Sequence, residues 1–394
     1  MKPQQAWRRL GAIALLALLS ACGGGGSDNT TTPAPVVVPT PPAANALAIT
    51  IDRGTTGNAA DTPYVTVTVC EPGTANCLDI DHVLVDTGSF GLRLLASATG
   101  SLALPTVAAP SGNPLAECAG FVSGFSWGSV RRADVRMSGE QAGSVPVQLV
   151  NDPALPIVPA ACSATGSSIG VGTGAKGILG VGFEKQDCGA ACVNSTAPGI
   201  YYSCAGTNCT PSVASLGAQV TNPVALLPTD NNGVVITLPD IPLGGVPLVG
   251  GTLLFGVGTQ ANNQLGAATV YTADAAGNVS TVYKGRTLAA FLDTGSNGIF
   301  FHDATLPTCS VSSDFYCPPA PVSLSATFIG TNSASTTVNF QVESPPVGAA
   351  AAHLGGDFDP RQFDWGLPFY FGRTVFSAIR GAATPAGVGP YWAF

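Results

Sequence analysis

The chain has 394 residues, of which 45% are hydrophobic and 10% are charged, and its formal net charge is −8. This balance is that of a folded protein with a large core, and it excludes a mainly disordered chain. Only 15 residues are Lys or Arg, and they do not cluster, so a nucleic-acid partner is excluded.

The N-terminal 22 residues have the features of a lipoprotein signal peptide. A start with three cations precedes the apolar run 10–19, which is shorter than the roughly 20 residues that span a bilayer. The run ends in Leu-Ser-Ala-Cys, which resembles a bacterial lipobox, and we therefore expect a lipid on Cys22. An ordinary secretory cleavage site beside an incidental cysteine is the alternative. Gly23 follows where an Asp would favour the inner membrane, so we expect a lipid-anchored protein of the outer membrane, on its periplasmic side or at the cell surface.

The signal peptide, residues 1–22, is followed by a linker at 23–44. This stretch is rich in Gly, Ser, Thr and Pro and has no apolar periodicity. The folded part begins near residue 45 and is long enough for two lobes of ordinary size. We place the lobes at 45–240 and 241–394.

Strand patterns recur in the folded part and helical patterns are scarce, which predicts an all-β fold. The predicted strands, in chain order, lie at 64–70, 144–150, 233–238, 252–255, 268–273, 280–284, 336–342, 372–379 and 391–394. We expect the strands at 268–273 and 280–284 to form a hairpin around a turn at 275–278. A brief helix is expected at 212–220.

Eleven cysteines are present, and ten remain once Cys22 is set aside. An even number in an exported chain predicts up to five disulfides. Sequence proximity favours three local pairs, which are Cys70 with Cys77, Cys118 with Cys162, and Cys309 with Cys317. Another four cysteines are expected to pair among themselves with open connectivity, namely Cys188, Cys192, Cys204 and Cys209. A zinc site in this quartet is the alternative, but export favours disulfides.

One pattern occurs twice in the folded part. An apolar run leads into Asp-Thr-Gly-Ser at 86–89 and again at 293–296, and a second apolar run follows each copy. The two aspartates are 293 − 86 = 207 residues apart, which suits one active-site loop in each lobe. A single Asp-Thr-Gly is a weak signal, whereas two copies with these flanks are much more specific. A pair of ordinary Asx-type turns is the alternative.

Asp86 and Asp293 are the predicted catalytic residues. Two carboxyls about 3 Å apart cannot both ionise easily, so they share a proton and titrate as a pair. The ionised member takes a proton from a water molecule, and the protonated member donates to the scissile carbonyl. The water then attacks without a covalent acyl-enzyme.

The residues that follow each Asp are predicted to support it. The glycines permit a tight turn whose N–H groups approach the carboxylate. The threonines are expected to hydrogen-bond to the opposite lobe, and the serines to orient the outer carboxylate oxygens. These supporting residues are Thr87, Gly88, Ser89, Thr294, Gly295 and Ser296.

An apolar segment with glycine lies downstream of each motif, at 177–183 and at 364–369. Glycine in a strand permits close backbone approach, so we expect each segment to pack beneath its loop. With these segments included, residues 60–380 resemble the pepsin-type aspartic proteases. The chain is more similar still to an uncharacterised family of bacterial lipoproteins with the same doubled motif.

This resemblance implies a bilobal, pepsin-like acid protease fold with a cleft between two β-rich lobes. It implies an exported, lipid-anchored aspartic endopeptidase that acts on a peptide or protein in that cleft. The expected partners are this substrate and a membrane, which the N-terminal lipid would contact. No cofactor and no metal ion is expected.

The sequence departs from the pepsin pattern at two places. The hairpin over the cleft usually carries a Tyr, whereas 118–127 offers Phe121, Phe125 and Trp127. Asp364 precedes the second apolar segment with glycine, at a position where the pepsin pattern has an apolar residue. These departures keep open a non-catalytic pepsin-like binding or structural lipoprotein of the cell envelope. A serine hydrolase is disfavoured, because the chain has only three histidines and a Ser-His-Asp triad needs one of them beside its nucleophile.

Overall fold

The structure is a computed structural model that describes residues 43–122, 124–164, 166, 168, 174–310, 312, 314–346 and 348–394. The predicted signal peptide, Cys22 and nearly all of the predicted linker lie outside these residues. Among the described residues, no helix has the length and apolar character needed to cross a bilayer.

Strands are the main regular elements of the described chain and its helices are single turns, so the all-β prediction is confirmed. The larger sheet has fifteen strands in the order β10 (Asn208–Pro211), β9 (Tyr201–Ala205), β5 (Leu115–Phe121), β6 (Gly124–Met137), β7 (Glu140–Val150), β4 (Phe90–Leu95), β8 (Gly177–Val181), β3 (Cys77–Asp86), β2 (Pro63–Cys70), β1 (Ala46–Ile51), β12 (Val249–Phe255), β11 (Gly233–Leu238), β21 (Arg373–Ala378), β24 (Tyr391–Ala393) and β13 (Val270–Thr272).

The second sheet has seven strands in the order β18 (Ser335–Val342), β17 (Val322–Ile329), β14 (Val279–Tyr283), β15 (Arg286–Asp293), β20 (Gln362–Gly366), β16 (Ile299–Phe301) and β19 (Gly355–Gly356). A small ribbon pairs β22 (Ala383–Thr384) with β23 (Gly387–Val388). The helices are single turns, namely α1 (Ala160–Ser163), α2 (Ala190–Asn194), η1 (Ala96–Ala98), η2 (Leu216–Ala218), η3 (Pro223–Leu226) and η4 (Leu367–Tyr370).

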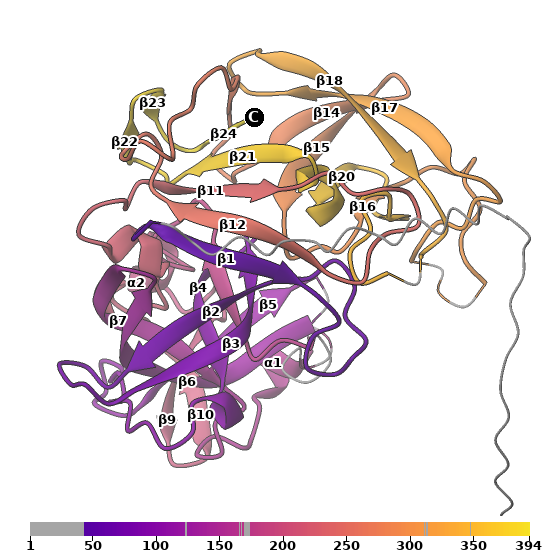
Figure 1. Ribbon diagram of the computed structural model, residues 1–394. Helices are drawn as coiled ribbons and strands as arrows, with labels where there is room; N and C mark the ends of the chain where they lie inside the picture. The colour runs from indigo at the N-terminus through magenta and orange to yellow at the C-terminus, as the bar shows by residue number, and fades with distance from the viewer. Residues whose placement is uncertain are drawn as a thin grey trace, which may run out of the picture. The chain divides into compact units, whose positions relative to one another are not determined.

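The middle of the larger sheet joins the two halves of the chain. Strands β1, β12, β11 and β21 lie side by side (Figure 1), and β1 pairs with β12 across some 200 residues of sequence, for example Ile49 with Gly251. The predicted boundary at 240/241 falls between β11 and β12, which are themselves paired. The exact lobe limits therefore stay a prediction, although the bilobal β fold is shown.

The main hydrophobic core runs through both halves. It contains Val85 and Leu179 from the strands below the first Asp-Thr-Gly-Ser loop, and Leu292 and Trp365 from those below the second. All four side chains are almost completely buried. The strands that carry the two loops therefore share one close-packed hydrophobic core, which limits how far the loops can move apart.

Two predicted local elements are wrong. The turn before residue 278 does form, with Asp274 N–H donating to Asn278 C=O at 2.8 Å, but its flanking strands do not pair. Instead β13 pairs with β24, and β14 pairs with β15 and β17. Pairing with β24 buries Tyr271 against Phe328 and Phe394. The sequence of a turn does not reveal such packing between distant residues.

The helix predicted at 212–220 is only the short turn η2. Gly217 lies inside it, and glycine weakens a helix by about 1 kcal/mol relative to alanine. A segment this short does not recover the free energy of helix nucleation by itself.

All ten cysteines after Cys22 are paired in the described chain. The three local pairs formed as predicted, Cys70–Cys77, Cys118–Cys162 and Cys309–Cys317. The open quartet resolves into the two nearest-neighbour pairs, Cys188–Cys192 and Cys204–Cys209. These bonds exclude the zinc alternative, because no thiolate is left to bind a metal.

Candidate active site

Each Asp-Thr-Gly-Ser loop is held by three strands arranged in the same way. In the first half, β3 ends at Asp86, and β8 runs parallel to β3 and antiparallel to β4, so that Asp86 lies opposite Gly180. In the second half, β15 ends at Asp293, and β20 pairs with β15 and β16 so that Asp293 lies opposite Gly366. The segments 177–183 and 364–369 therefore lie beside the loops, as the sequence indicated.

Two glycines in these strands are required by close backbone approach. A Cβ on Gly180 would lie 2.6 Å from the backbone nitrogen of Phe90, and one on Gly366 would lie 2.1 Å from the carbonyl oxygen of Gly298. Neither neighbour is a flexible side chain that could move aside. The glycines therefore set how tightly each strand fits beneath its loop.

The structure brings the carboxyl groups of Asp86 and Asp293 together. The point where a Cβ on Gly295 would lie is 2.8 Å from Oδ1 of Asp86 and 3.0 Å from Oδ1 of Asp293. The same point for Gly88 is 2.7 Å from Cγ of Asp293. The two carboxyls are close enough that the charge of Asp86 raises the pKa of Asp293. Glycine at both positions leaves the space that this pair occupies.

Each carboxylate receives the same two local donors. Asp86 accepts from Gly88 N–H at 2.8 Å and from the Ser89 hydroxyl at 2.5 Å. Asp293 accepts from Gly295 N–H at 2.8 Å and from the Ser296 hydroxyl at 2.9 Å. The serine bonds hold Oδ2 and the glycine bonds hold Oδ1 of each acid, so both oxygens of each carboxyl group are fixed in orientation.

Reciprocal hydrogen bonds connect the two loops. The Thr87 hydroxyl donates to Leu292 C=O at 3.1 Å and accepts from Thr294 N–H at 3.0 Å. The Thr294 hydroxyl donates to Val85 C=O at 2.7 Å and accepts from Thr87 N–H at 3.1 Å. Both threonines are buried, so each lost bond would leave an unsatisfied group.

Tyr370, on η4, is a participant that the sequence analysis missed. Its hydroxyl lies 3.2 Å from that of Thr87. Because the Thr87 hydrogen goes to Leu292, the tyrosine must be the donor. A Tyr four residues after a strand-end glycine is too common a pattern to have marked this role.

The electrostatics favour one retained proton. Burial, followed by the charge of Asp86, raises the pKa of Asp293 to about 8, against the lowering by Ser296 and Gly295. Asp86 is 5% exposed, whereas Asp293 is only partly buried and Gly88 and Gly295 are exposed. A shared proton thus sits at a place that solvent can reach.

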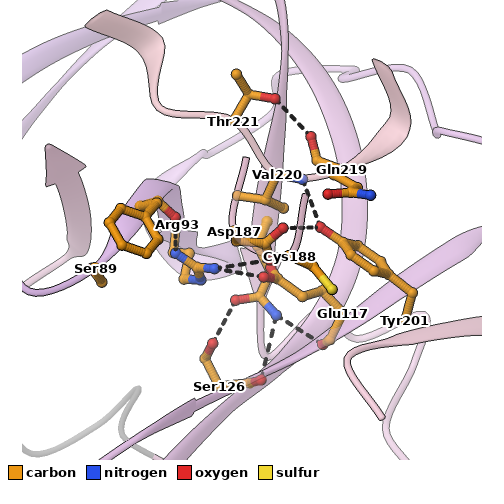
Figure 2. A network of polar contacts seen from close by, with 12 residues as sticks. Ser89, Arg93, Glu117, Ser126, Asp187, Cys188, Tyr201, Gln219, Val220 and Thr221 are labelled. Atoms are coloured by element: carbon orange, nitrogen blue, oxygen red, sulfur yellow. Dashed lines mark hydrogen bonds and ion pairs between the residues drawn. The ribbon is translucent and has the colours of Figure 1, made fainter. Parts of the chain in front are cut away.

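A buried ionic network lies behind the first loop (Figure 2). Arg93, on β4, donates to Glu117 at 2.5 Å and to Asp187 at 3.3 Å, and it also donates to Phe90 C=O at 2.7 Å. Burial, followed by the charge of Glu117, raises the pKa of Asp187 well above its usual range, and Tyr201 donates to it. The network ties β4 to the β5–β6 hairpin through Glu117.

The tip of the β5–β6 hairpin is the counterpart of the covering hairpin in the pepsin pattern. Phe121 lies 5.7 Å from the Arg93 guanidinium, and Val122 is 88% exposed. Trp127 is buried and donates to Leu155 C=O, so it does not cover the carboxyl pair. Of the three aromatic residues named from sequence, Phe121 is the one nearest the hairpin tip.

The fold and the paired loops define the class to which the structure belongs. The chain is similar to the crystal structure of an aspartic proteinase from Irpex lacteus, with a TM-score of 0.50 and 16% identity over 89% of this chain and 96% of that chain. At this identity the likeness shows a pepsin-like fold. No curated protein matches the chain. The family described as "Protein of unknown function (DUF3443)" matches residues 41–394, and the chain belongs to this family.

Proposed function

We propose that the protein is an exported, lipid-anchored aspartic endopeptidase of the cell envelope. The observation that carries this proposal is the meeting of two carboxyl groups from two loops, each with its own Gly and Ser donors. A purely structural role would not require two acids to be held against each other, because like charges at this distance are unfavourable.

In the proposed reaction, a water molecule binds between the inner carboxyl oxygens. The ionised carboxylate accepts one proton from this water, and the resulting hydroxide attacks the peptide carbonyl carbon. The protonated carboxyl donates its proton to the carbonyl oxygen, giving a neutral tetrahedral intermediate. Collapse breaks the C–N bond, with a proton transferred to the leaving amine. No cofactor or metal is needed in this sequence.

Lipidation of Cys22 and outer-membrane placement belong to the same proposal and rest on the sequence. Five disulfides in the described chain support an oxidising compartment. Labelling cells with an alkyne fatty acid should mark the wild-type protein and leave Cys22→Ser unlabelled. Equal labelling of both would remove the lipid anchor from the proposal.

The peptidase proposal is tested with purified full-length protein in detergent and an unfolded protein as substrate. We expect cleavage at acidic and neutral pH that is lost as the pH rises through about 8, because the pair keeps one proton until the pKa of Asp293 is passed. Asp86→Asn and Asp293→Asn should each lower the cleavage rate by about 10³-fold or more. Asp359→Asn, a half-buried carboxylate paired with the exposed Arg361, is the matched control and should keep full activity. Undiminished cleavage by both site variants would exclude the mechanism.

A non-catalytic binding lipoprotein is the second candidate. It is favoured by the covering hairpin, whose tip presents Phe121 and Val122 and no tyrosine hydroxyl. Without cleavage at any pH, retention of an unfolded polypeptide by the wild type, weakened in Phe121→Ala, would favour binding.

A further inference from the structure

One arginine contacts both the first Asp-Thr-Gly-Ser loop and the β5–β6 hairpin. Arg93 Nη1 donates to Phe90 C=O at 2.7 Å. Phe90 follows Ser89, whose hydroxyl donates to Asp86. Arg93 Nη2 donates to Oε1 of Glu117, on β5, at 2.5 Å (Figure 2). A single guanidinium therefore joins the backbone of the catalytic loop to the hairpin.

The same side chain also lies close to the tip of the hairpin. Side chains alternate between the two faces of a strand, so Glu117 and Phe121 lie on the same face of β5. The guanidinium carbon of Arg93 is 5.7 Å from the centre of the Phe121 ring, which is within the range of a cation–π contact. This contact needs no hydroxyl group at the hairpin tip.

The ion pair between Arg93 and Glu117 is buried. The side chain of Arg93 is 3% exposed and that of Glu117 is fully buried. Among the described residues, Arg93 is the only donor to the Glu117 carboxylate, whose Oε2 has no hydrogen-bond partner. Losing this one bond would leave a buried carboxylate on β5 without a donor, which is unfavourable.

Arg93 has two roles that a substitution can separate. Its cation compensates two buried acids, Glu117 and Asp187, and another cation at this place would do the same. The bridge from the loop to the hairpin requires more, because two N–H groups must reach Phe90 and Glu117 at once. A planar guanidinium holds its N–H groups in fixed directions, whereas a lysine ammonium is a single point charge on a flexible chain.

We propose that Arg93 is a positioning residue that holds the β5–β6 hairpin against the first loop, and so over the carboxyl pair. The inference rests on the proposed function, because the hairpin is the element expected to cover a polypeptide in the cleft. Arg93 acts through Phe90 and Glu117 and does not touch the reacting atoms. Loss of the bridge should therefore weaken substrate binding more than it slows the chemical step.

The first measurement is amide hydrogen exchange of the full-length protein in detergent, which requires no activity. Arg93→Lys keeps the cation and removes the bridge, so exchange at 117–121 should become about tenfold faster. Arg131→Lys is the matched control, since Arg131 is on β6 and its donors go to Ser129 and to the buried carboxylate of Asp152. It should leave exchange at 117–121 unchanged.

Urea unfolding separates positioning from charge compensation. Arg93→Lys should unfold at nearly the same urea concentration as the wild type, because the buried acids keep a cation. If Arg93 only compensates charge, exchange in the hairpin of this variant should also match the wild type, and that result would overturn the proposal. An equal acceleration in Arg131→Lys would overturn it too.

Glu117→Gln approaches the same bond from the hairpin and decides the matter if Arg93→Lys does not fold. The amide keeps an acceptor oxygen but carries no charge, so exchange at 117–121 should become about threefold faster. Combined with Arg93→Lys it should add nothing, because both substitutions weaken one bond. Independent effects that multiply to about thirtyfold would contradict a shared bridge.

Cleavage kinetics distinguish this inference from the peptidase proposal. Arg93→Lys should raise KM by about tenfold and change kcat by less than about threefold. If hairpin exchange behaves as expected and no cleavage occurs, the peptidase proposal fails and the role of Arg93 stands. If cleavage occurs and neither variant alters hairpin exchange, the inference about Arg93 fails alone.

Discussion

The two halves of the site share one backbone plan and differ in what surrounds it. Both end a strand at an Asp, cross-pair that strand with a glycine-containing strand, and supply one Gly and one Ser donor. Behind the loops, however, Ile178 matches Asp364, and Arg93 matches Phe300 at seven residues after each Asp. The repeated plan brings the carboxyls together, and the unequal surroundings decide how protons are held between them.

The two catalytic candidates also differ in their exposure to solvent. Asp86 is nearly buried, with a neutral apolar strand beside it, whereas Asp293 is partly exposed and has a second acid close by. Two identical motifs can therefore give two chemically distinct carboxyls, because a pKa depends on burial and neighbouring charge as well as on local hydrogen bonds. Substitutions at matched positions of the two halves test this division.

The largest difference is expected at Arg93 and Phe300. Arg93→Met leaves Glu117 and Asp187 buried without their cation, which should lower the free energy of unfolding by about 3–5 kcal/mol. Phe300→Leu, at the matching position, should cost about 1 kcal/mol. Urea unfolding at neutral pH measures both. Equal losses would mean that the network does not anchor the first half.

The next largest loss of stability is expected at Gly180 and Gly366, and it should be similar in the two halves. Gly366→Ala and Gly180→Ala each force a methyl group against backbone atoms, and each should lower stability by about 3 kcal/mol, with Gly366→Ala the worse. Gly217→Ala is the control, since its added methyl meets open space. Thermal unfolding separates them. A neutral Gly366→Ala would contradict the tight fit of β20 beneath its loop.

The cross-loop threonines are expected to be nearly equivalent. Thr87→Val removes bonds to Leu292, Thr294 and Tyr370, and should cost about 2 kcal/mol. Thr294→Val removes one partner fewer and should cost somewhat less. Thr66→Val, at an exposed strand position, is the control. If neither buried threonine affects stability more than Thr66, the loops are not joined by these bonds.

Asp293 should show its raised pKa as a pH-dependent loss of stability. Between about pH 4 and pH 8 the unfolded chain has released this proton while the folded chain retains it, so folding becomes less favourable as pH rises through that window. Relative to Asp293→Asn, the wild type should lose about 1–2 kcal/mol from pH 4 to pH 8, after allowance for solvent screening. Denaturant unfolding at several pH values measures the difference, and parallel curves would exclude it.

The sequence predicted the parts of the site that consecutive residues encode. Asp-Thr-Gly-Ser specifies a carboxylate, its turn and its donors within four residues, so the loops and their partner segments could be anticipated twice over. The pairing of distant strands could not be predicted. For example, β13 pairs with β24, which lies more than a hundred residues further along the chain, and no local sequence pattern indicates that partner. Tyr370 was missed for a similar reason, since a single hydroxyl acts through tertiary placement.

Asp364 is an intermediate case. The sequence marked it as a departure from an apolar position, but only the structure places it beside Ser296 and the carboxyl pair. The quartet of cysteines is comparable, because composition predicted that they pair and geometry decided how. In each case residue type was informative, and the missing information was which groups lie close together.

The central claim is that Asp86 and Asp293 hold a proton between them. The most direct measurement is the titration of the Asp293 carboxyl carbon by ¹³C NMR in the wild type and in Asp86→Asn. We expect a pKa well above 4 in the wild type that falls by about 1 or more in Asp86→Asn, because the neighbouring charge is removed. An Asp293 that titrates near 4 in both proteins would show two independent carboxylates and would contradict it.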